Sequence, residues 1–277
     1  MKANSFEYIS GNEFKSILKN LHESSVYSKF LAGSQSIGPM LNLRLTQPEQ
    51  LIDIKGVLEL KEAKIKNTYL EMGACITHAN IEDELIPDVT NGMMQYVAKN
   101  IAYRAIRNQG TIGGSLCHAD PAADWITTMT LLDAQLELIR LDANTEKIET
   151  RTVPMAKFMT GPFTTVIHDD EMLSKICIPI YSKNVKWGYY KICQKPGEFS
   201  QATAAVLSDD EKKIYRLVVG ATQSTPLLLT DAKQTLDGYK TEDLSRWLKE
   251  SLAADEFEIQ RYKVAVQRAI EMLHMKD

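Results

Sequence analysis

The chain has 277 residues, of which 44% are hydrophobic and 25% charged, and its formal net charge is −4. These values are typical of a globular protein of two or three domains and disfavour nucleic acid as a main partner. No apolar stretch reaches the roughly 20 residues of a membrane-spanning helix, and residues 1–10 lack the apolar segment of a signal peptide. We therefore expect a cytoplasmic protein.

The first part of the chain alternates strand-like runs with helical repeats. Between residues 12 and 21, the side chains of Phe14, Ile17, Leu18 and Leu21 fall on one face of a helix. We expect strands over 6–10, 26–32 and 50–54, and helices over 12–21 and 40–45.

The middle of the chain mixes β-rich runs with helices. Lys66 and Asn67 form a turn-prone pair between two strands, and Thr77 is a suitable N-cap for the helix after it. We expect two strands within 64–77, helices over 79–85, 89–99 and 121–132, a strand over 135–141, a further segment over 153–158 and a strand over 171–179.

The last part of the chain predicts an aromatic strand, a hairpin and two amphipathic helices. The hairpin turns at 208–210, where a serine and two aspartates separate two apolar runs. We expect strands over 186–192, 202–207 and 214–220, and helices over 244–252 and 258–275. Soft linkers near Gly56 and at 181–184 divide the chain into 1–55, 56–180 and 181–277.

The most informative stretch surrounds three glycines. Gly110, Gly113 and Gly114 let the backbone turn sharply and approach a ligand, because no Cβ is present. Asp120 followed by Pro121 predicts a helix start, with a cap residue and then proline at the first helical position. A glycine-rich turn before a capped helix favours phosphate binding through free backbone N–H groups, and an ordinary tight turn is the alternative.

A second turn, rich in glycine and serine, lies at 33–39, where a strand ends and a helical segment follows. Its small residues could also cradle a phosphate. It is not a P-loop, because no G-K-[ST] follows, and it lacks the G-x-G-x-x-G fingerprint of a Rossmann dinucleotide site.

The cysteines and histidines show no metal-binding pattern. The four cysteines contain no C-x-x-C pair, and the five histidines show neither H-x-x-x-H nor H-E-x-x-H spacing. We therefore expect no metal site in this chain, and reduced, mostly buried thiols. No Ser-His-Asp or paired-carboxylate arrangement is visible, so no catalytic residue is assigned.

Together, the two turns resemble the two flavin signatures of one family. Residues 32–36 (Ala-Gly-Ser-Gln-Ser) resemble the first signature, and 111–115 (Thr-Ile-Gly-Gly-Ser) with 119–124 (Ala-Asp-Pro-Ala-Ala-Asp) resemble the second. The family is the FAD-binding medium subunit of the xanthine dehydrogenase and carbon monoxide dehydrogenase group of molybdenum hydroxylases. The resemblance covers essentially the whole chain, with Ser34 in place of the usual glycine and Ser115 in place of a common asparagine.

The resemblance implies an α+β fold, in which a two-part PCMH-type (vanillyl-alcohol-oxidase-like) FAD-binding domain precedes a small α/β C-terminal domain of antiparallel strands and helices. Residues 1–55 and 56–180 would be the N-terminal and middle FAD-binding subdomains, and 181–277 the C-terminal domain. The backbone N–H groups of both turns would hold the FAD pyrophosphate. Asp124 would bind the adenosine ribose, and an ordinary acid in the first turn of a helix is the alternative. The implied FAD-binding residues are Leu31, Ala32, Gly33, Ser34, Gln35, Ser36, Ile37, Thr111, Ile112, Gly113, Gly114, Ser115 and Asp124.

Residues 190–198 resemble a loop of the C-terminal domain that lies near the isoalloxazine ring. There, Tyr190 could cover the ring, and Lys191 or Lys195 could stabilise negative charge on reduced flavin. An aromatic core strand with its lysines in solvent is the alternative.

The resemblance also implies the function. The chain would be an FAD-carrying electron-transfer subunit that accepts electrons from two two-iron two-sulfur clusters in a small partner subunit and passes them to an external acceptor. A large partner subunit would carry the molybdenum cofactor, in a heterotrimer or a dimer of heterotrimers. A self-contained FAD oxidase or reductase is one alternative, although no separate substrate domain is apparent. A scaffold subunit that has lost FAD is another, although the small residues of both turns are intact.

Overall fold

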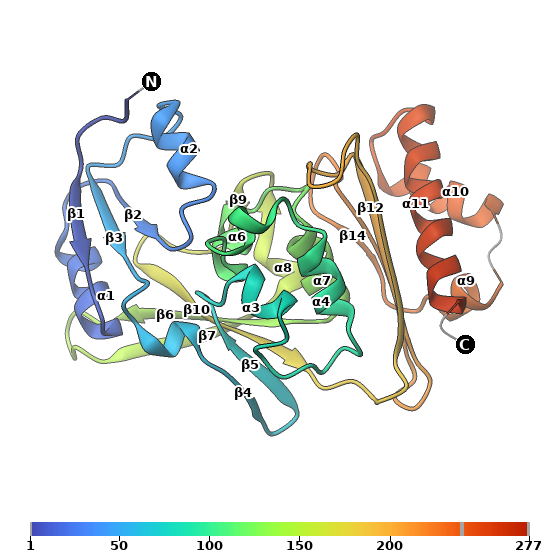
Figure 1. The fold of residues 1–277 in the computed structure, drawn as a ribbon, viewed down its shortest axis with the longest axis horizontal. Coiled ribbons are helices and arrows are strands. Elements are labelled where there is room, and N and C mark those ends of the chain that lie inside the picture. The colour runs from blue at the N-terminus through green and yellow to red at the C-terminus, as the bar shows by residue number, and fades with distance from the viewer. Residues whose placement is uncertain (1, 239–240, 276–277) are drawn as a thin grey trace.

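The computed structural model describes residues 2–238 and 241–275. Three main sheets follow one another along the chain, and the longest dimension of the molecule runs from the first of them to the last (Figure 1). Residues 1, 239–240 and 276–277, which fall within the predicted domain ranges, lie outside the described residues.

The N-terminal sheet is small and parallel, with strand order β1-β3-β2. Its elements are β1 (Glu7–Ser10), α1 (Phe14–Glu23), β2 (Ser28–Leu31), α2 (Ile37–Asn42) and β3 (Gln50–Asp53). Helix α1 buries Ile17 and Leu18, as its apolar face predicts. Helix α2 follows the first glycine turn after β2, so the N-terminal end of this helix faces that turn.

The middle sheet has five strands in the order β4-β5-β10-β6-β7, and every neighbouring pair is antiparallel. The strands are β4 (Ala63–Lys66), β5 (Tyr69–Gly73), β6 (Gln135–Leu141), β7 (Ile148–Pro154) and β10 (Glu171–Pro179). A separate two-stranded sheet pairs β8 (Met159–Gly161) with β9 (Thr164–Thr165).

Short helices connect and cover the strands of the middle region. They are η1 (Leu58–Lys61), α3 (His78–Glu82), α4 (Met93–Lys99), α5 (Arg104–Arg107), α6 (Ile112–His118), α7 (Asp124–Leu131) and α8 (Met155–Phe158). Helix α7 is buried from its second residue to its last. A helix that is buried on all sides belongs to the interior of a protein.

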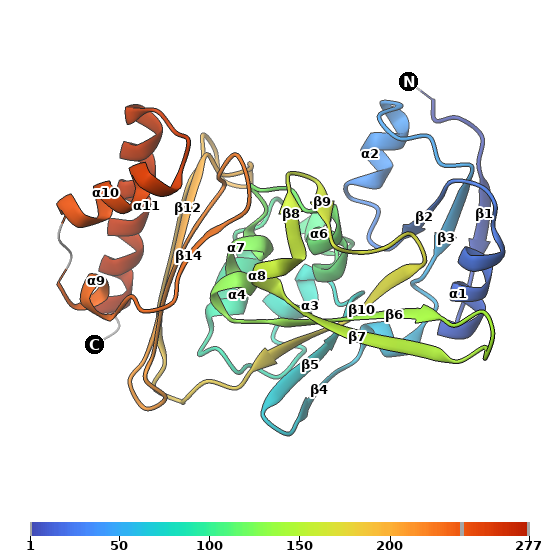
Figure 2. The ribbon, with the colours of Figure 1, turned by 180° about the vertical axis from the view of Figure 1, so that it is seen from behind.

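The C-terminal sheet is antiparallel, with its strands in chain order. It consists of β11 (Lys186–Ile192), β12 (Ala202–Asp209), β13 (Ile214–Gly220) and β14 (Leu227–Leu229), followed by α9 (Lys233–Asp237), α10 (Thr241–Ser251) and α11 (Glu256–His274). Helix α11 lies against one face of this sheet, and α7 lies on the other side (Figures 1 and 2).

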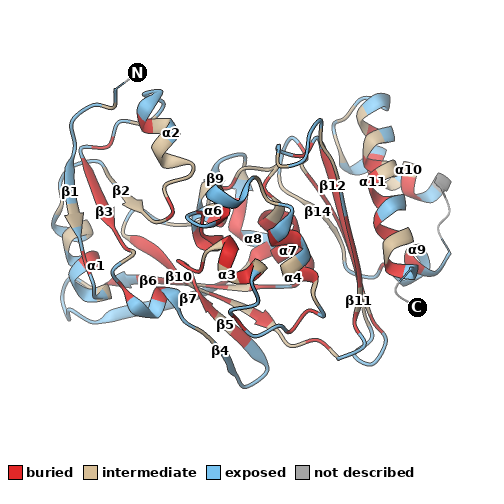
Figure 3. Ribbon diagram, viewed as in Figure 1, coloured by how far each residue is buried: buried red, intermediate tan, exposed pale blue. Residues whose placement is uncertain are grey.

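The buried side chains form two hydrophobic clusters. The larger one runs from α1 through the middle sheet to the α7-facing side of the C-terminal sheet, where it includes Ala205, Leu207 and Val218. The smaller one lies between the other face of that sheet and the C-terminal helices. Buried segments therefore continue across the centre of the molecule, with exposed residues concentrated at loops and outer helix faces (Figure 3).

Most of the expected elements form, and the differences concentrate around the glycine motif. The glycines at 113 and 114 lie inside helix α6, which the sequence analysis did not predict. The helix expected at 121–132 begins instead at Asp124, and Ala123 is its N-cap. The Asp120 carboxylate accepts from the backbone N–H of Ala122, so it closes a turn before the helix. The prediction of Asp120 as the helix cap was therefore wrong.

Candidate FAD site

The two glycine turns lie in direct contact. A Cβ at Gly33 would overlap the carbonyl oxygen of Gln109 and lie 2.8 Å from the Cα of Gly110. A side chain at position 33 would therefore push the turns apart. This contact explains why glycine is required there, and it brings the two predicted flavin signatures into one site.

The first turn offers free backbone donors. Ser34 has a left-handed backbone, with φ 64°, between Gly33 and the start of α2. In the described parts of the chain, the N–H groups of Ser34, Gln35 and Ser36 donate to no protein acceptor. Successive unpaired N–H groups beside a left-handed residue form an anion-binding concavity.

The second turn differs from the expectation, because its N–H groups already have acceptors. Gly113 donates to the Ala74 carbonyl at 3.0 Å, Gly114 to the Thr111 hydroxyl at 3.1 Å and Ser115 to the Thr111 carbonyl at 3.0 Å. These three N–H groups are therefore paired within the chain and are less available to a phosphate than those of the first turn. Thr111 is instead the N-cap of α6.

The second turn contributes open space at Gly114, where a ligand can approach the first turn closely. Gly114 is exposed, and a Cβ on it would lie 2.7 Å from the Thr111 hydroxyl and 4.0 Å from the Cβ of Ala32, on the first turn. Gly113 is buried, and a Cβ on it would collide with Ala74. Gly113 therefore serves packing, whereas Gly114 leaves room in front of the first turn.

Asp124 binds side chains of strand β11. Its carboxylate accepts from the Tyr189 hydroxyl at 2.5 Å and from the Lys191 ammonium at 3.0 and 3.2 Å. Both charged side chains are only 11% exposed. The alternative in which Lys191 is solvated is thus wrong, whereas Lys195 is exposed. Burial and Asp124 hold the pKa of Tyr189 well above its usual value, so Tyr189 stays protonated and donates.

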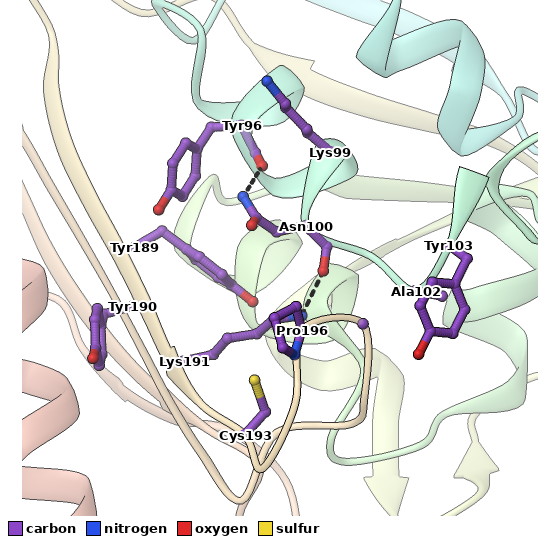
Figure 4. Close-up of a pocket in the computed structure, with 11 residues that line it drawn as sticks. Tyr96, Lys99, Asn100, Ala102, Tyr103, Tyr189, Tyr190, Lys191, Cys193 and Pro196 are labelled. Atoms are coloured by element: carbon purple, nitrogen blue, oxygen red, sulfur yellow. Dashed lines mark hydrogen bonds between the residues drawn. The ribbon is translucent and has the colours of Figure 1, made fainter.

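A cavity of about 300 Å³ lies beside this ion pair. Figure 4 shows Tyr96 and Tyr189 on one side of it and Tyr103 on the other, with Lys191 between them. Lys191 also donates to the Asn100 carbonyl at 2.8 Å. The sequence analysis did not identify Tyr96 or Tyr103, because no motif connects these residues of the middle region to a strand of the C-terminal sheet.

His78 is a further residue that the sequence analysis did not assign to the site. It opens α3, and its backbone N–H donates to the Gly110 carbonyl at 2.9 Å. Its Nδ1 accepts from the indole N–H of Trp125 at 3.0 Å. A lone histidine before a helix carries no sequence signal for such a role.

Within the described ranges, no group of three or more His, Cys, Asp or Glu side chains could hold a metal ion. In the same ranges, no helix has the length and apolar character needed to span a membrane.

A family model described as the FAD binding domain in molybdopterin dehydrogenase matches residues 4–181. The chain belongs to this family. The predicted family, the PCMH-type α+β fold and the FAD cofactor are thereby confirmed, and the chain is an FAD-carrying electron-transfer subunit of an oxidoreductase.

Individual relatives agree with this assignment. The chain is 32% identical to the caffeine dehydrogenase subunit beta of Pseudomonas sp. (strain CBB1), over 86% of this chain and 80% of the relative. It is 31% identical to the nicotine 6-hydroxylase medium subunit of Paenarthrobacter nicotinovorans, over 76% and 73%. A solved carbon monoxide dehydrogenase from Hydrogenophaga pseudoflava matches with a TM-score of 0.87 and 25% identity, covering 100% of this chain and 99% of that one.

Proposed function

We propose that this chain works in the cytoplasm as the medium subunit of a heterotrimer or dimer of heterotrimers, with a large molybdenum-cofactor subunit and a small iron–sulfur subunit. It takes electrons from the iron–sulfur clusters and passes them to an external acceptor. The names of the relatives, which include medium subunits and a subunit beta, support the partner assignment. Bound FAD supplies the redox chemistry, and the chain positions it.

The contact between the two glycine turns carries the proposal for the cofactor site. Among the described residues, the N–H groups of Ser34, Gln35 and Ser36 have no acceptor, whereas those of Gly113, Gly114 and Ser115 are paired within the chain. Gly114 leaves open space beside the first turn. We propose that the diphosphate of FAD accepts from Ser34, Gln35 and Ser36 and lies against Gly114. The remaining predicted residues would line this position: Leu31, Ala32, Gly33, Ile37, Thr111, Ile112, Gly113 and Ser115.

The cavity beside Asp124 supports a site for the adenosine end of FAD. Asp124 and Lys191 are in contact, so they serve the same end of an extended FAD. By the family resemblance, Asp124 was assigned to the ribose, whereas the loop that contains Lys191 was assigned to the isoalloxazine ring. A carboxylate suits ribose hydroxyls as their acceptor, and the tyrosine rings of the cavity offer stacking surfaces for a base. We therefore assign Asp124, Lys191 and this cavity to the adenosine.

Gly114→Leu tests the diphosphate site. Leucine would fill the space that separates Gly114 from Ala32, so we expect the purified variant to lose its flavin absorbance while its fold is retained. Gly161→Leu is the matched control, because a Cβ at Gly161 meets no atom within 4 Å. Normal flavin occupancy in Gly114→Leu would refute the assignment of this turn.

Lys191→Met tests which end of FAD lies in the cavity. If the cavity holds the adenosine, the variant should bind FAD and ADP about tenfold more weakly and bind FMN as the unaltered chain does, because a hydrogen bond to a charged group is lost. Weaker FMN binding with unchanged ADP binding would place the isoalloxazine there instead.

Two measurements separate this function from its alternatives. A purified chain without flavin absorbance would favour an FAD-free scaffold. Purification without molybdenum- and iron-containing chains, combined with turnover of a substrate, would favour a self-contained flavin oxidase or reductase.

We also propose that residues 1–55, 56–180 and 181–277 form three domains. The presence of one main sheet in each range supports this division.

A further inference from the structure

His78 lies behind the point where the two glycine turns meet. A Cβ at Gly110 would lie 2.8 Å from His78 Nε2 and 2.9 Å from its Cδ2, so the edge of the imidazole packs against the Cα of Gly110. On its other side, Gly110 meets Gly33. The imidazole, Gly110 and Gly33 are therefore stacked in contact, and a movement of the ring would be transmitted to the first turn.

The hydrogen bonds of His78 determine its tautomer. Trp125, which is fully buried, has an indole N–H that can only donate, so the Nδ1 atom that accepts from it carries no proton. Burial and the positive charge of Arg107 lower the pKa of His78 to about 4, so the ring is neutral at pH 7. The single ring proton is therefore on Nε2.

Among the residues that the structure describes, the Nε2–H group has no acceptor, and Nε2 is not one of the fully buried unpaired atoms. His78 as a whole is only 5% exposed, so Nε2 is the polar atom of the ring that reaches solvent. Buried donors in native proteins are almost always paired, with protein, water or ligand. A donor that is oriented by a buried tryptophan and opens to solvent beside Gly110 is available to an acceptor of the bound cofactor.

The same residue connects both proposed ends of the site. Trp125, which orients the ring, is the neighbour of Asp124 in α7, and the backbone N–H of His78 donates to Gly110 at 2.9 Å. His78 thus joins the start of α7 to the contact between the turns.

We propose that His78 is a positioning residue for FAD, which holds Gly110 against Gly33 and donates its Nε2–H toward the diphosphate side of the site. The inference rests on the proposed FAD site and goes beyond it, because it assigns an orienting role to a residue outside both flavin signatures.

The first experiment is a long-range ¹H–¹⁵N spectrum of the full chain with labelled histidine, recorded at pH 7 with and without ADP. We expect a neutral Nε2–H tautomer for the signal that disappears in His78→Asn, and a shift of its Nε2 resonance when ADP binds. An Nε2 resonance that is unchanged by bound ADP would assign the donor to a water molecule and overturn the proposal.

Two substitutions at His78 then distinguish the hydrogen-bonding roles of the two ring nitrogens. Asparagine can still accept from Trp125 but does not reach the Nε2 position, whereas glutamine reaches that position with an N–H donor. We expect His78→Asn to weaken FAD binding about tenfold and His78→Gln to recover most of that loss. The control is His22→Asn, at an exposed position of α1.

The outcomes separate the inference from the function on which it rests. If the unaltered chain binds FAD and both His78 variants bind it equally well at unchanged melting temperature, the inference is wrong and the FAD site stands. If the unaltered chain binds neither FAD nor ADP, the proposed site is wrong, and the inference is refuted with it.

Discussion

The protonation of His78 couples the stability of the protein to pH. Its pKa in the folded chain is about 4, because the ring is buried and faces Arg107, against an ordinary value of 6.5. Between these values the unfolded chain binds more protons than the folded chain, so the free energy of unfolding rises with pH. Below about pH 4, His78 is protonated in both the folded and the unfolded chain, so it no longer makes the free energy of unfolding depend on pH.

We expect His78→Asn to lose this pH dependence. The shift corresponds to about 3 kcal/mol, so the unfolding free energy of the unaltered chain should fall by up to this amount, relative to that of the variant, as the pH is lowered from about 6.5 to about 4. Urea unfolding at a series of pH values measures the difference, and His22→Asn should follow the unaltered chain. Parallel curves for His78→Asn and the unaltered chain would show that the ring titrates normally.

Among the elements, helix α6 carries Gly113 and Gly114, the glycines of the second turn. The helix has seven residues and contains two consecutive glycines, which are poor helix formers. It forms because its first N–H groups donate to Ala74 and Thr111, and because Gly113 fits against Ala74. Tertiary contacts therefore outweigh the low intrinsic propensity.

Thr111→Val should remove the cap of α6. We expect a loss of about 1 kcal/mol in the free energy of unfolding, together with weaker FAD binding, because the N–H group of Gly114 loses its acceptor. Asp255→Ala is the matched control, since Asp255 caps α11 in the C-terminal region. The control should lose similar stability and keep its FAD affinity, as measured by denaturant titration and flavin fluorescence. Equal FAD affinities in the two variants would contradict the role of α6.

An element is predictable from the sequence when the interactions that stabilise it join residues that are close in sequence. The strands at 171–179 and 186–192 were predicted with the bounds that the structure has, because local alternation and turn residues define them. Helix α6 was missed because its two glycines favour a turn, and because Ile112 and Gly113 donate to Ile76 and Ala74, which are far from the helix in sequence. The start of α7 was misplaced because Asp120 and Pro121 give the signals of a helix cap while forming a separate turn. The glycines were recognised from their motif, but the pairing of Asp124 with Lys191 required the fold.

At the scale of the whole molecule, helix α7 joins the cofactor region to the C-terminal sheet. Asp124 at its first turn binds β11, and its Thr127 faces β13, where a Cβ at Gly220 would overlap the threonine side chain. The larger hydrophobic cluster passes through the same contact. The adenosine site that we propose therefore depends on the packing of the C-terminal sheet against α7.

Gly220→Val tests this dependence. The added side chain cannot fit against Thr127, so we expect a destabilisation of about 1–3 kcal/mol, as for other overpacked cores. The displaced sheet should also separate Lys191 from Asp124, so ADP and FAD should bind more weakly while FMN binding changes less. Gly161→Val adds the same volume in open space and should leave stability and affinity unchanged. Calorimetry and the affinities for ADP, FAD and FMN measure both effects. If the variant is destabilised but binds ADP normally, the adenosine site does not depend on the C-terminal sheet.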